Sequence, residues 1–159
     1  MRGSQAVTIR ALGPGDRTVW EPMWAAYCAF YETAIPQATT EATFARLCDA
    51  DTPMYGSLAL DSDSGEALGF AHCVVHPFTW SPRAACYLED LFVEPSVRRR
   101  GAARALIGDL IARAEGAGWG RIYWMTRVNN TAARRLYDSL AERDDFVRYA
   151  IAFGDAPRD

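Results

Sequence analysis

Hydrophobic residues recur along the chain at two spacings, which predict helices and strands in turn. From Asp16, a candidate helix N-cap, to about Tyr31, large apolar side chains lie near helical spacing. The Thr39-Thr40 pair favours the start of a second helix over 41–48. A third helix is predicted over 101–115 and a fourth over 130–141. The apolar stripe of the third helix comprises Ala103, Leu106, Ile107, Leu110 and Ala114.

Strand-like segments fill the rest of the pattern. They are predicted at 7–10, 56–60, 67–75, 84–93, 121–126 and 146–153, with a loop over 76–83. In the last strand, one face would carry Val147, Tyr149, Ile151 and Phe153. The predicted order is therefore β-α-α-β-β-β-α-β-α-β. This order indicates one α/β (α+β) domain over residues 1–159, in which helices flank a mixed central sheet.

The composition fits a folded cytoplasmic protein. Half of the 159 residues are hydrophobic, which is enough for a sizeable core. No apolar stretch approaches the ~18–20 residues that span a bilayer, and residues 1–12 lack the apolar core of a signal peptide. We therefore expect no membrane partner.

The cysteines and histidines show no metal-binding spacing. His72 is interpreted as a packed strand residue and His76 as a loop residue, so no metal is expected. Because no CxxC pair occurs, free thiols are expected in a reducing cytosol. These thiols belong to Cys28, Cys48, Cys73 and Cys86.

The charges are segregated along the chain, although the net charge is only −3. Residues 98–135 hold nine Arg against two acidic residues, whereas residues 1–97 hold five Arg against twelve acidic residues. The first of these segments suits an anion and the second a cationic partner. A net acidic chain argues against broad nucleic-acid binding, so no nucleic-acid partner is expected.

The sharpest feature of the basic segment is the run Arg98-Arg99-Arg100-Gly101-Ala102-Ala103. It follows a predicted strand and opens a predicted helix. The N-terminus of a helix is already partly positive, so each arginine there destabilises the helix by roughly a few tenths of a kcal/mol. The first-turn N–H groups also lack helical partners, and a bound phosphate would relieve both problems. The alternative is a solvated Arg cluster on a surface loop. Neither a P-loop nor a GxGxxG turn is present.

Two motifs in this region resemble those of the GNAT acetyltransferase superfamily. Arg98-x-x-Gly101-x-Ala103 is similar to the R/Q-x-x-G-x-G/A motif whose loop binds the pyrophosphate of acetyl-CoA. Asn130-x-x-Ala133-x-x-x-Tyr137 is similar to the downstream block of that family. The resemblance covers residues 7–153, and the predicted order of elements agrees with it. Arg99 departs from the pattern, because many members have glycine there.

The resemblance implies acetyl-CoA as cosubstrate and assigns roles to particular residues. Tyr137 would protonate the CoA thiolate, since a tyrosine pKa of about 10 is not far above that of a thiol. Asn130 is either a helix N-cap or a CoA ligand, or both. The alternatives are a buried strand for 91–93 and a core aromatic for Tyr137. The implied cofactor-binding residues are Leu91, Phe92, Val93, Arg98, Arg99, Arg100, Gly101, Ala102, Ala103, Arg104, Asn130 and Ala133.

The segment Tyr87-Leu88-Glu89-Asp90-Leu91-Phe92-Val93 resembles a strand of diamine (spermidine/spermine) acetyltransferases. That branch acetylates a primary amine of a small polyamine or amino compound. We assign Glu89 as the general base, acting through water, and Asp90 as an anchor for the amine, although the two roles could be exchanged. In a regular strand they would face opposite ways. Tyr27 and Trp80 are candidates to line the amine site by cation–π contact, or simply to pack the first helix and a loop.

The sequence thus predicts an N-acetyltransferase that transfers acetyl directly to a small-molecule amine in a ternary complex. Cys28, Cys73 and Cys86 could accept an acyl group, but His72 and Cys73 face opposite ways in a strand and form a poor base–nucleophile couple. The alternatives are a CoA-binding regulatory module without catalysis, a protein or peptide amine acetyltransferase, and, last, a nucleic-acid-binding protein. The acceptor and the oligomeric state stay open, a homodimer included.

Overall fold

The structure is a computed structural model that describes residues 6–154 and 156. It divides into two compact units, 1–125 and 126–159, which are described separately. The first unit contains a five-stranded sheet in the order β1-β2-β3-β4-β5. β1 to β4 pair antiparallel and β5 lies parallel to β4, which confirms the expected mixed sheet. The strands are β1 Val7–Ala11, β2 Met54–Asp61, β3 Ala67–Phe78, β4 Ser81–Val93 and β5 Arg121–Tyr123.

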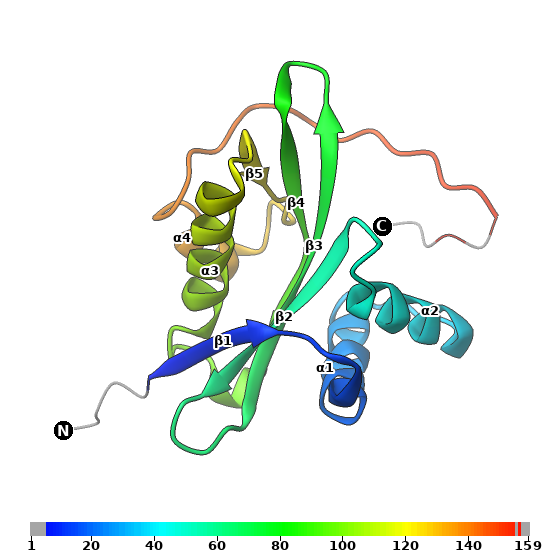
Figure 1. Ribbon diagram of the computed structural model, residues 1–159, viewed down its shortest axis with the longest axis vertical. Coiled ribbons are helices and arrows are strands. Elements are labelled where there is room, and N and C mark those ends of the chain that lie inside the picture. The colour runs from blue at the N-terminus through cyan, green and yellow to red at the C-terminus, as the bar shows by residue number, and fades with distance from the viewer. Residues whose placement is uncertain (1–5, 155, 157–159) are drawn as a thin grey trace. The chain divides into compact units, whose positions relative to one another are not determined.

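Helices cover both faces of this sheet. α1 (Arg17–Phe30) and α2 (Gln37–Cys48) pack on one face, and α3 (Ala102–Ala117) packs on the other (Figure 1). Two short 3-10 helices, η1 (Pro14–Asp16) and η2 (Pro95–Val97), lead into α1 and α3. The predicted α/β arrangement, in which helices flank a mixed central sheet, is therefore confirmed. None of the described helices is long and apolar enough to cross a bilayer.

Each face of the sheet has its own core. On the α3 face, Leu106, Ile107 and Leu110 are buried. Burying one such side chain stabilises a fold by about 1.5–3 kcal/mol. The core on the α1 and α2 face comprises Leu12, Trp20, Met23, Phe44, Leu47, Leu58, Phe70 and Phe92.

A β-bulge interrupts the pairing of β3 with β4. His72 pairs with Asp90 but Cys73 pairs with Leu88, so Glu89 is an extra residue in β4. One extra residue exchanges the faces of all residues after it. Asp90 therefore reaches His72 on the α1 face, where Phe92 also joins the aromatic core. The regular strand on which the opposite placement of Glu89 and Asp90 depended is not present.

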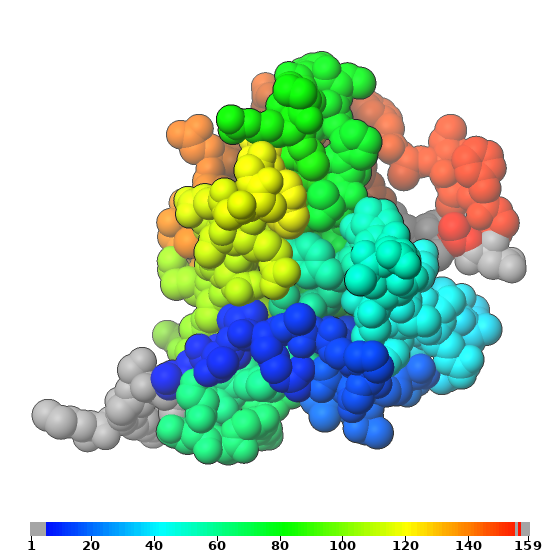
Figure 2. All heavy atoms as spheres, in the orientation of Figure 1, coloured from blue at the N-terminus to red at the C-terminus, as the bar shows by residue number. Residues whose placement is uncertain are grey.

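The predicted loop over 76–83 is wrong, because β3 and β4 extend to a tight hairpin with only Thr79 and Trp80 between them. The tip of this hairpin stands clear of α1 and α2 (Figure 2). Pro77 and Pro82 suggested a loop because proline cannot donate to a ladder. Near the tip, however, the hairpin is two-stranded, since β2 pairs with β3 only up to Val74. The unpaired outer edges accommodate proline there.

The boundaries of two further elements also differ from prediction. α2 begins at Gln37, because the carbonyl of Pro36 already accepts hydrogen bonds from the N–H groups of Thr39 and Thr40. The Thr40 hydroxyl is not a cap but accepts a hydrogen bond of 3.2 Å from Trp24 Nε1. β5 ends at Tyr123 rather than at residue 126.

The second unit contains the short helix α4 (Thr131–Tyr137), which ends earlier than the predicted residue 141. The predicted strand over 146–153 is wrong: these residues are irregular, and they find no ladder partner in the described chain. A strand needs such a partner to satisfy its backbone, whatever its side-chain alternation. The exposed apolar side chains of the segment are Phe146, Val147, Tyr149, Ile151 and Phe153.

Candidate active site

The N-terminus of α3 is arranged to receive an anion. Gly101 is the N-cap, and its φ of 84° lies in the left-handed region that glycine adopts without strain. No side chain caps this end, and the first turn contains no acidic residue. Ala102 is buried beneath it. The N–H groups of Ala102 and Ala103 have no partner within the helix, an arrangement that suits an anionic group.

Two of the three preceding arginines hold this loop in place. Arg98 Nε donates a hydrogen bond of 3.4 Å to the carbonyl of Val93, at the end of β4. Arg100 Nη1 lies 3.6 Å from Oδ2 of the buried Asp61. Asp61 also accepts N–H bonds from the β2–β3 turn. Each guanidinium has five donors, so these contacts leave N–H groups for a phosphate.

Arg99 has a φ of 68°, in the left-handed region, where a side chain costs roughly 1–2 kcal/mol. Arg99→Gly is therefore expected to stabilise the fold by up to about 1 kcal/mol, after glycine's extra chain entropy is subtracted. A rise in Tm of about 2–4 °C would show this gain. Arg99→Ala is the matched control: it also removes the guanidinium but keeps a Cβ at the positive φ, so Tm should not rise. A lower Tm for Arg99→Gly would contradict the prediction.

The second half of β4 has an open edge. β5 pairs only with Ala85, Cys86 and Tyr87, so residues 88–93 have no strand partner on that side within the described sheet. Here "open edge" denotes this side of residues 88–93. Unpaired backbone groups of this kind can bind an extended chain. The predicted cofactor-binding residues Leu91, Phe92 and Val93 lie on this edge, directly before the loop to α3.

The structure brings three of the predicted acceptor-site residues together. Asp90 is partly exposed on the α1 face. Burial raises the pKa of the neighbouring Tyr27, and the negative charge of Asp90 raises it further. Glu89 is exposed at the bulge, and its charge also acts on Tyr27. The ring of Tyr27 stacks on Trp24 at 5.6 Å between centroids. Two carboxylates and an aromatic ring therefore form one cluster, which suits a cationic amine.

Trp80 does not belong to this cluster. It lies at the tip of the β3–β4 hairpin and is 84% exposed. The distance along β3 from His72, opposite Asp90, to Trp80 is about 25 Å at about 3.3 Å per residue. Within the first unit, Trp80 thus lies away from Tyr27 and Asp90.

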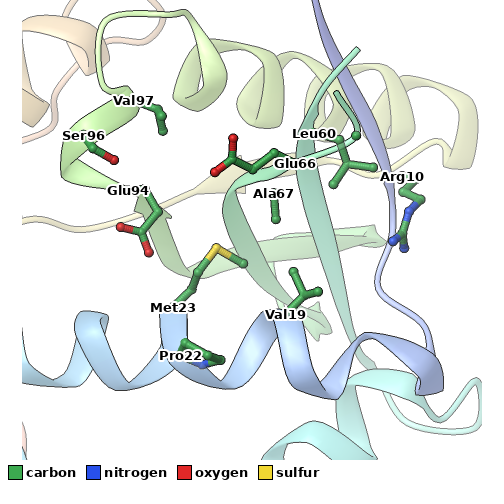
Figure 3. A pocket seen from close by; sticks show the side chains of 11 residues that line it. Arg10, Val19, Pro22, Met23, Leu60, Glu66, Ala67, Glu94, Ser96 and Val97 are labelled. Atoms are coloured by element: carbon green, nitrogen blue, oxygen red, sulfur yellow. The ribbon is translucent and has the colours of Figure 1, made fainter. Parts of the chain in front are cut away.

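A surface hollow of about 530 Å³ lies elsewhere on the first unit. It is bounded by α1, by the β2–β3 turn and by the residues after β4, with Glu66 and Glu94 on one side and Arg10 on the other (Figure 3). None of the predicted site residues lines it. The hollow is therefore a feature separate from the cluster around Asp90.

Both histidines and the thiol of Cys73 have protein partners. His76 Nε2 lies 2.7 Å from the Tyr123 hydroxyl and its Nδ1 donates to the carbonyl of Pro77. No group of three or more metal-ligating side chains was found among the described residues. All four cysteines are free thiols, as expected. A hydrogen bond with Cys86 and burial raise the pKa of Cys73, so this thiol is a poor nucleophile.

The downstream motif lies in the second unit. Asn130 caps α4: its Oδ1 accepts a hydrogen bond from the Ala133 N–H at 3.4 Å. Its Nδ2 donates to the Thr126 hydroxyl at 3.0 Å. Tyr137 is half-buried at the end of α4. The N-cap interpretation of Asn130 is confirmed, and the roles of Asn130, Ala133 and Tyr137 toward CoA stay predictions.

His72, which contacts Asp90, was not among the site residues predicted from the sequence. The sequence shows a histidine in an apolar strand, but its pairing with Asp90 depends on the bulge. A cross-strand search for histidine–carboxylate pairs over all registers could have found it.

Comparison with solved structures shows the fold. The chain superposes on a ribosomal-protein-alanine N-acetyltransferase from Brucella melitensis biovar Abortus 2308 with a TM-score of 0.77, at 24% identity, covering 93% of this chain and 100% of the other. An aminoglycoside N-acetyltransferase AAC(6')-Iy in complex with CoA gives 0.76 at 22% identity, covering 92% and 95%.

Comparison of sequences shows the family. The D-amino-acid N-acetyltransferase HPA3 of Saccharomyces cerevisiae is 34% identical over 143 residues, 90% of this chain and 89% of that protein. An uncharacterized N-acetyltransferase, YhfO of Bacillus subtilis, is 27% identical over 91% of this chain and 97% of its own length. Residues 20–141 match the sequence pattern of the acetyltransferase (GNAT) family. The chain therefore belongs to the GNAT family and is an N-acetyltransferase.

Proposed function

We propose that this enzyme transfers an acetyl group from acetyl-CoA to the primary amine of a small cationic molecule, a polyamine or another amino compound, directly in a ternary complex. One observation carries the proposal: residues 91–93 of the open edge lie along the chain between an acidic cluster and the N-terminus of α3, whose first turn suits an anion. The acidic cluster consists of Glu89, Asp90 and Tyr27. The helix end is the Gly101 N-cap of α3.

The residues of the first unit fit acetyl-CoA. The phosphates match the uncapped N–H groups of α3 and the arginines before it. The pantetheine arm is an extended chain with amide groups, which match the backbone groups of Leu91–Val93 on the open edge. Backbone N–H donors there also suit the negative oxygen that forms on the thioester carbonyl during attack.

The acceptor reaches the enzyme as an ammonium ion and must lose a proton before it attacks. Asp90 binds the cation, and Glu89 removes the proton through a water molecule. The amine nitrogen then bonds to the acetyl carbon, the carbon–sulfur bond breaks, and Tyr137 gives its proton to the thiolate. The nitrogen loses its second proton, which passes through water to the Tyr137 oxygen, so that the amide and the neutral phenol result. The raised pKa of the buried Cys73 and the complete burial of Cys86 support direct transfer rather than an acyl-cysteine intermediate.

The acceptor class rests on two lines of support. The strand 87–93 resembles diamine acetyltransferases, which points to a polyamine. The yeast relative is by its name a D-amino-acid N-acetyltransferase, which points to an amino acid. Both kinds of acceptor carry an ammonium group, which a carboxylate beside aromatic rings attracts.

Acetyl-CoA is expected to raise the Tm of the protein by roughly 5–10 °C at about 100 times its Kd, because ligand binding at that level stabilises a fold by about 2.7 kcal/mol. Acetate and adenosine at the same concentration should leave Tm unchanged. Thermal unfolding followed by fluorescence measures all three. An equal response to acetyl-CoA, acetate and adenosine would refute the proposal.

Two alanine substitutions in α3 locate the binding site. Ala103→Glu places a carboxylate in the first turn, where the helix dipole favours it but a phosphate is repelled. The Tm rise with acetyl-CoA should disappear in this variant. Ala112→Glu adds the same charge at an exposed position later in α3 and should keep the rise. An equal loss in both variants would place the anion elsewhere.

An acetyl-transfer screen that detects the free thiol of CoA tests the reaction. The panel contains spermidine and putrescine, both enantiomers of several amino acids, aminoglycosides and peptides. Turnover with small cationic amines is the expected result. Binding of acetyl-CoA without transfer to any amine would indicate a regulatory CoA-binding protein, and transfer to peptides alone would indicate a protein acetyltransferase.

A further inference from the structure

His72 lies in β3 with both ring nitrogens engaged, although it is only 2% exposed. Its Nε2 lies 2.8 Å from Nε1 of Trp20 in α1. Its Nδ1 lies 2.8 Å from Oδ2 of Asp90 in β4. Three elements of the first unit thus meet at this imidazole.

Trp20 determines the direction of both hydrogen bonds of His72. An indole N–H can only donate, so Nε2 of His72 accepts and carries no proton. The ring proton is therefore on Nδ1, which donates to Asp90. The chain of donors runs in one direction, from Trp20 through His72 to Asp90.

The imidazole is also held rigidly by aromatic rings. Phe70 stacks on it with 4.3 Å between centroids and an interplanar angle of 17°. Trp24 packs against it at 5.5 Å. Because the ring cannot turn in this enclosure, its N–H holds the Asp90 oxygen in one place.

Asp90 itself is not sealed in the core. Its side chain is 15% exposed, and its Oδ2 is the oxygen that His72 contacts. A carboxylate has about four acceptor positions, so the two donors His72 and Tyr27 leave acceptor capacity on the exposed part. His72 thus holds one oxygen of Asp90 on the core side, while the exposed part of the carboxylate can still contact a ligand.

We propose that His72 is a positioning residue that fixes the Asp90 carboxylate to receive the ammonium group of the acceptor, with Trp20 setting the orientation of the imidazole. This inference rests on the proposed function, and it narrows the acceptor class to amines that bind as cations. A purely structural role would not require this series of hydrogen bonds, because apolar side chains that replace all of the hydrogen-bonded partners can fill a core equally well.

Steady-state kinetics of His72→Leu and His72→Asn test the proposal. Leu removes the donor and Asn keeps an N–H near the position of Nδ1. The probe is the best acceptor among spermidine, D-alanine and the other amines of the screen. For His72→Leu we expect the KM of the amine to rise about tenfold, which equals about 1.4 kcal/mol of binding. The KM of acetyl-CoA should stay within about twofold, and His72→Asn should restore most of the amine affinity.

A second variant and a spectroscopic measurement distinguish the proposed role of His72 from a folding defect in His72→Leu. Trp20→Phe keeps an aromatic ring but loses the indole N–H, so the amine KM should rise about threefold. In the wild-type protein, ¹⁵N NMR of labelled histidine should show the proton of His72 on Nδ1. A proton on Nε2 would overturn the proposal.

The other outcomes are equally decisive. A fall in kcat alone, or equal rises in both KM values, would show a structural role and overturn the positioning role. Failure of the proposed function gives a different result. The wild-type protein would then acetylate none of the amines, although NMR would still show the proton of His72 on Nδ1. This outcome would refute the role of His72 in amine binding.

Discussion

Tyr137→Phe is expected to lower kcat by about 100-fold and to change the Kd of acetyl-CoA by no more than about twofold. General acid catalysis contributes typically about 10²–10⁴-fold, and phenylalanine keeps the ring while it removes the only proton that the side chain can give. Tyr137 is half-buried at the end of α4, so the retained ring preserves its packing. Free-thiol release gives kcat, and the thermal shift with acetyl-CoA gives the affinity.

Tyr149→Phe is the matched control for this prediction. Tyr149 is 91% exposed in the same unit, so the loss of its hydroxyl should leave both kcat and affinity unchanged. If Tyr137→Phe retained wild-type kcat, another group would have to protonate the thiolate.

Gly69→Ala is expected to destabilise the fold by about 3 kcal/mol and to lower Tm by roughly 6–12 °C. Gly69 pairs with Val93 across β3 and β4. A Cβ at this position would lie 2.2 Å from the carbonyl oxygen of Phe92 and 3.0 Å from Cα of Val93. Because both contacts are with backbone, β4 must move at the open edge, and the affinity for acetyl-CoA should fall as well. Urea unfolding and the thermal shift measure the two effects.

Gly108→Ala separates this clash from the general effect of replacing glycine. Gly108 lies inside α3, and apart from the neighbouring residues and backbone of its own helix no described heavy atom lies within 4 Å of the added Cβ. Alanine should therefore stabilise the helix by about 0.5–1 kcal/mol. Equal stability of Gly69→Ala and the wild-type protein would mean that β3 and β4 can separate at little cost.

The elements that were predicted well are those whose pattern is long and whose ends carry a signal. α1 has apolar residues at helical spacing from Trp20 to Tyr27 and follows Asp16. α3 begins after Gly101 and ends at Gly118, which is in the left-handed conformation. The loop before α3, which we propose binds the phosphates, could be singled out for the same reason, since its charge and its glycine are both local features.

The features that were missed depend on which strands pair and in what register. Leu88-Glu89-Asp90-Leu91 is compatible with a regular strand or with a bulge, and only the pairing with β3 distinguishes them. The pairing of His72 with Asp90 could therefore not be predicted from the local pattern of either strand alone. The alternation of Val147, Tyr149 and Ile151 likewise suggested a strand, although the described chain provides no ladder for it.

The bulge at Glu89 has a consequence for how this strand can vary between related proteins. Substitutions at 89 or 90 would change the charge offered to an acceptor, while the buried residues of β4 keep their places. Deletion of Glu89 would remove the bulge and leave a regular strand in which Asp90 still pairs with His72 and Phe92 with Phe70, whereas deletion of Leu91 would turn Phe92 out of the aromatic core. The charge beside the acceptor can therefore change by point mutation, and a residue can be lost at the bulge without changing the pairing of Asp90 and Phe92.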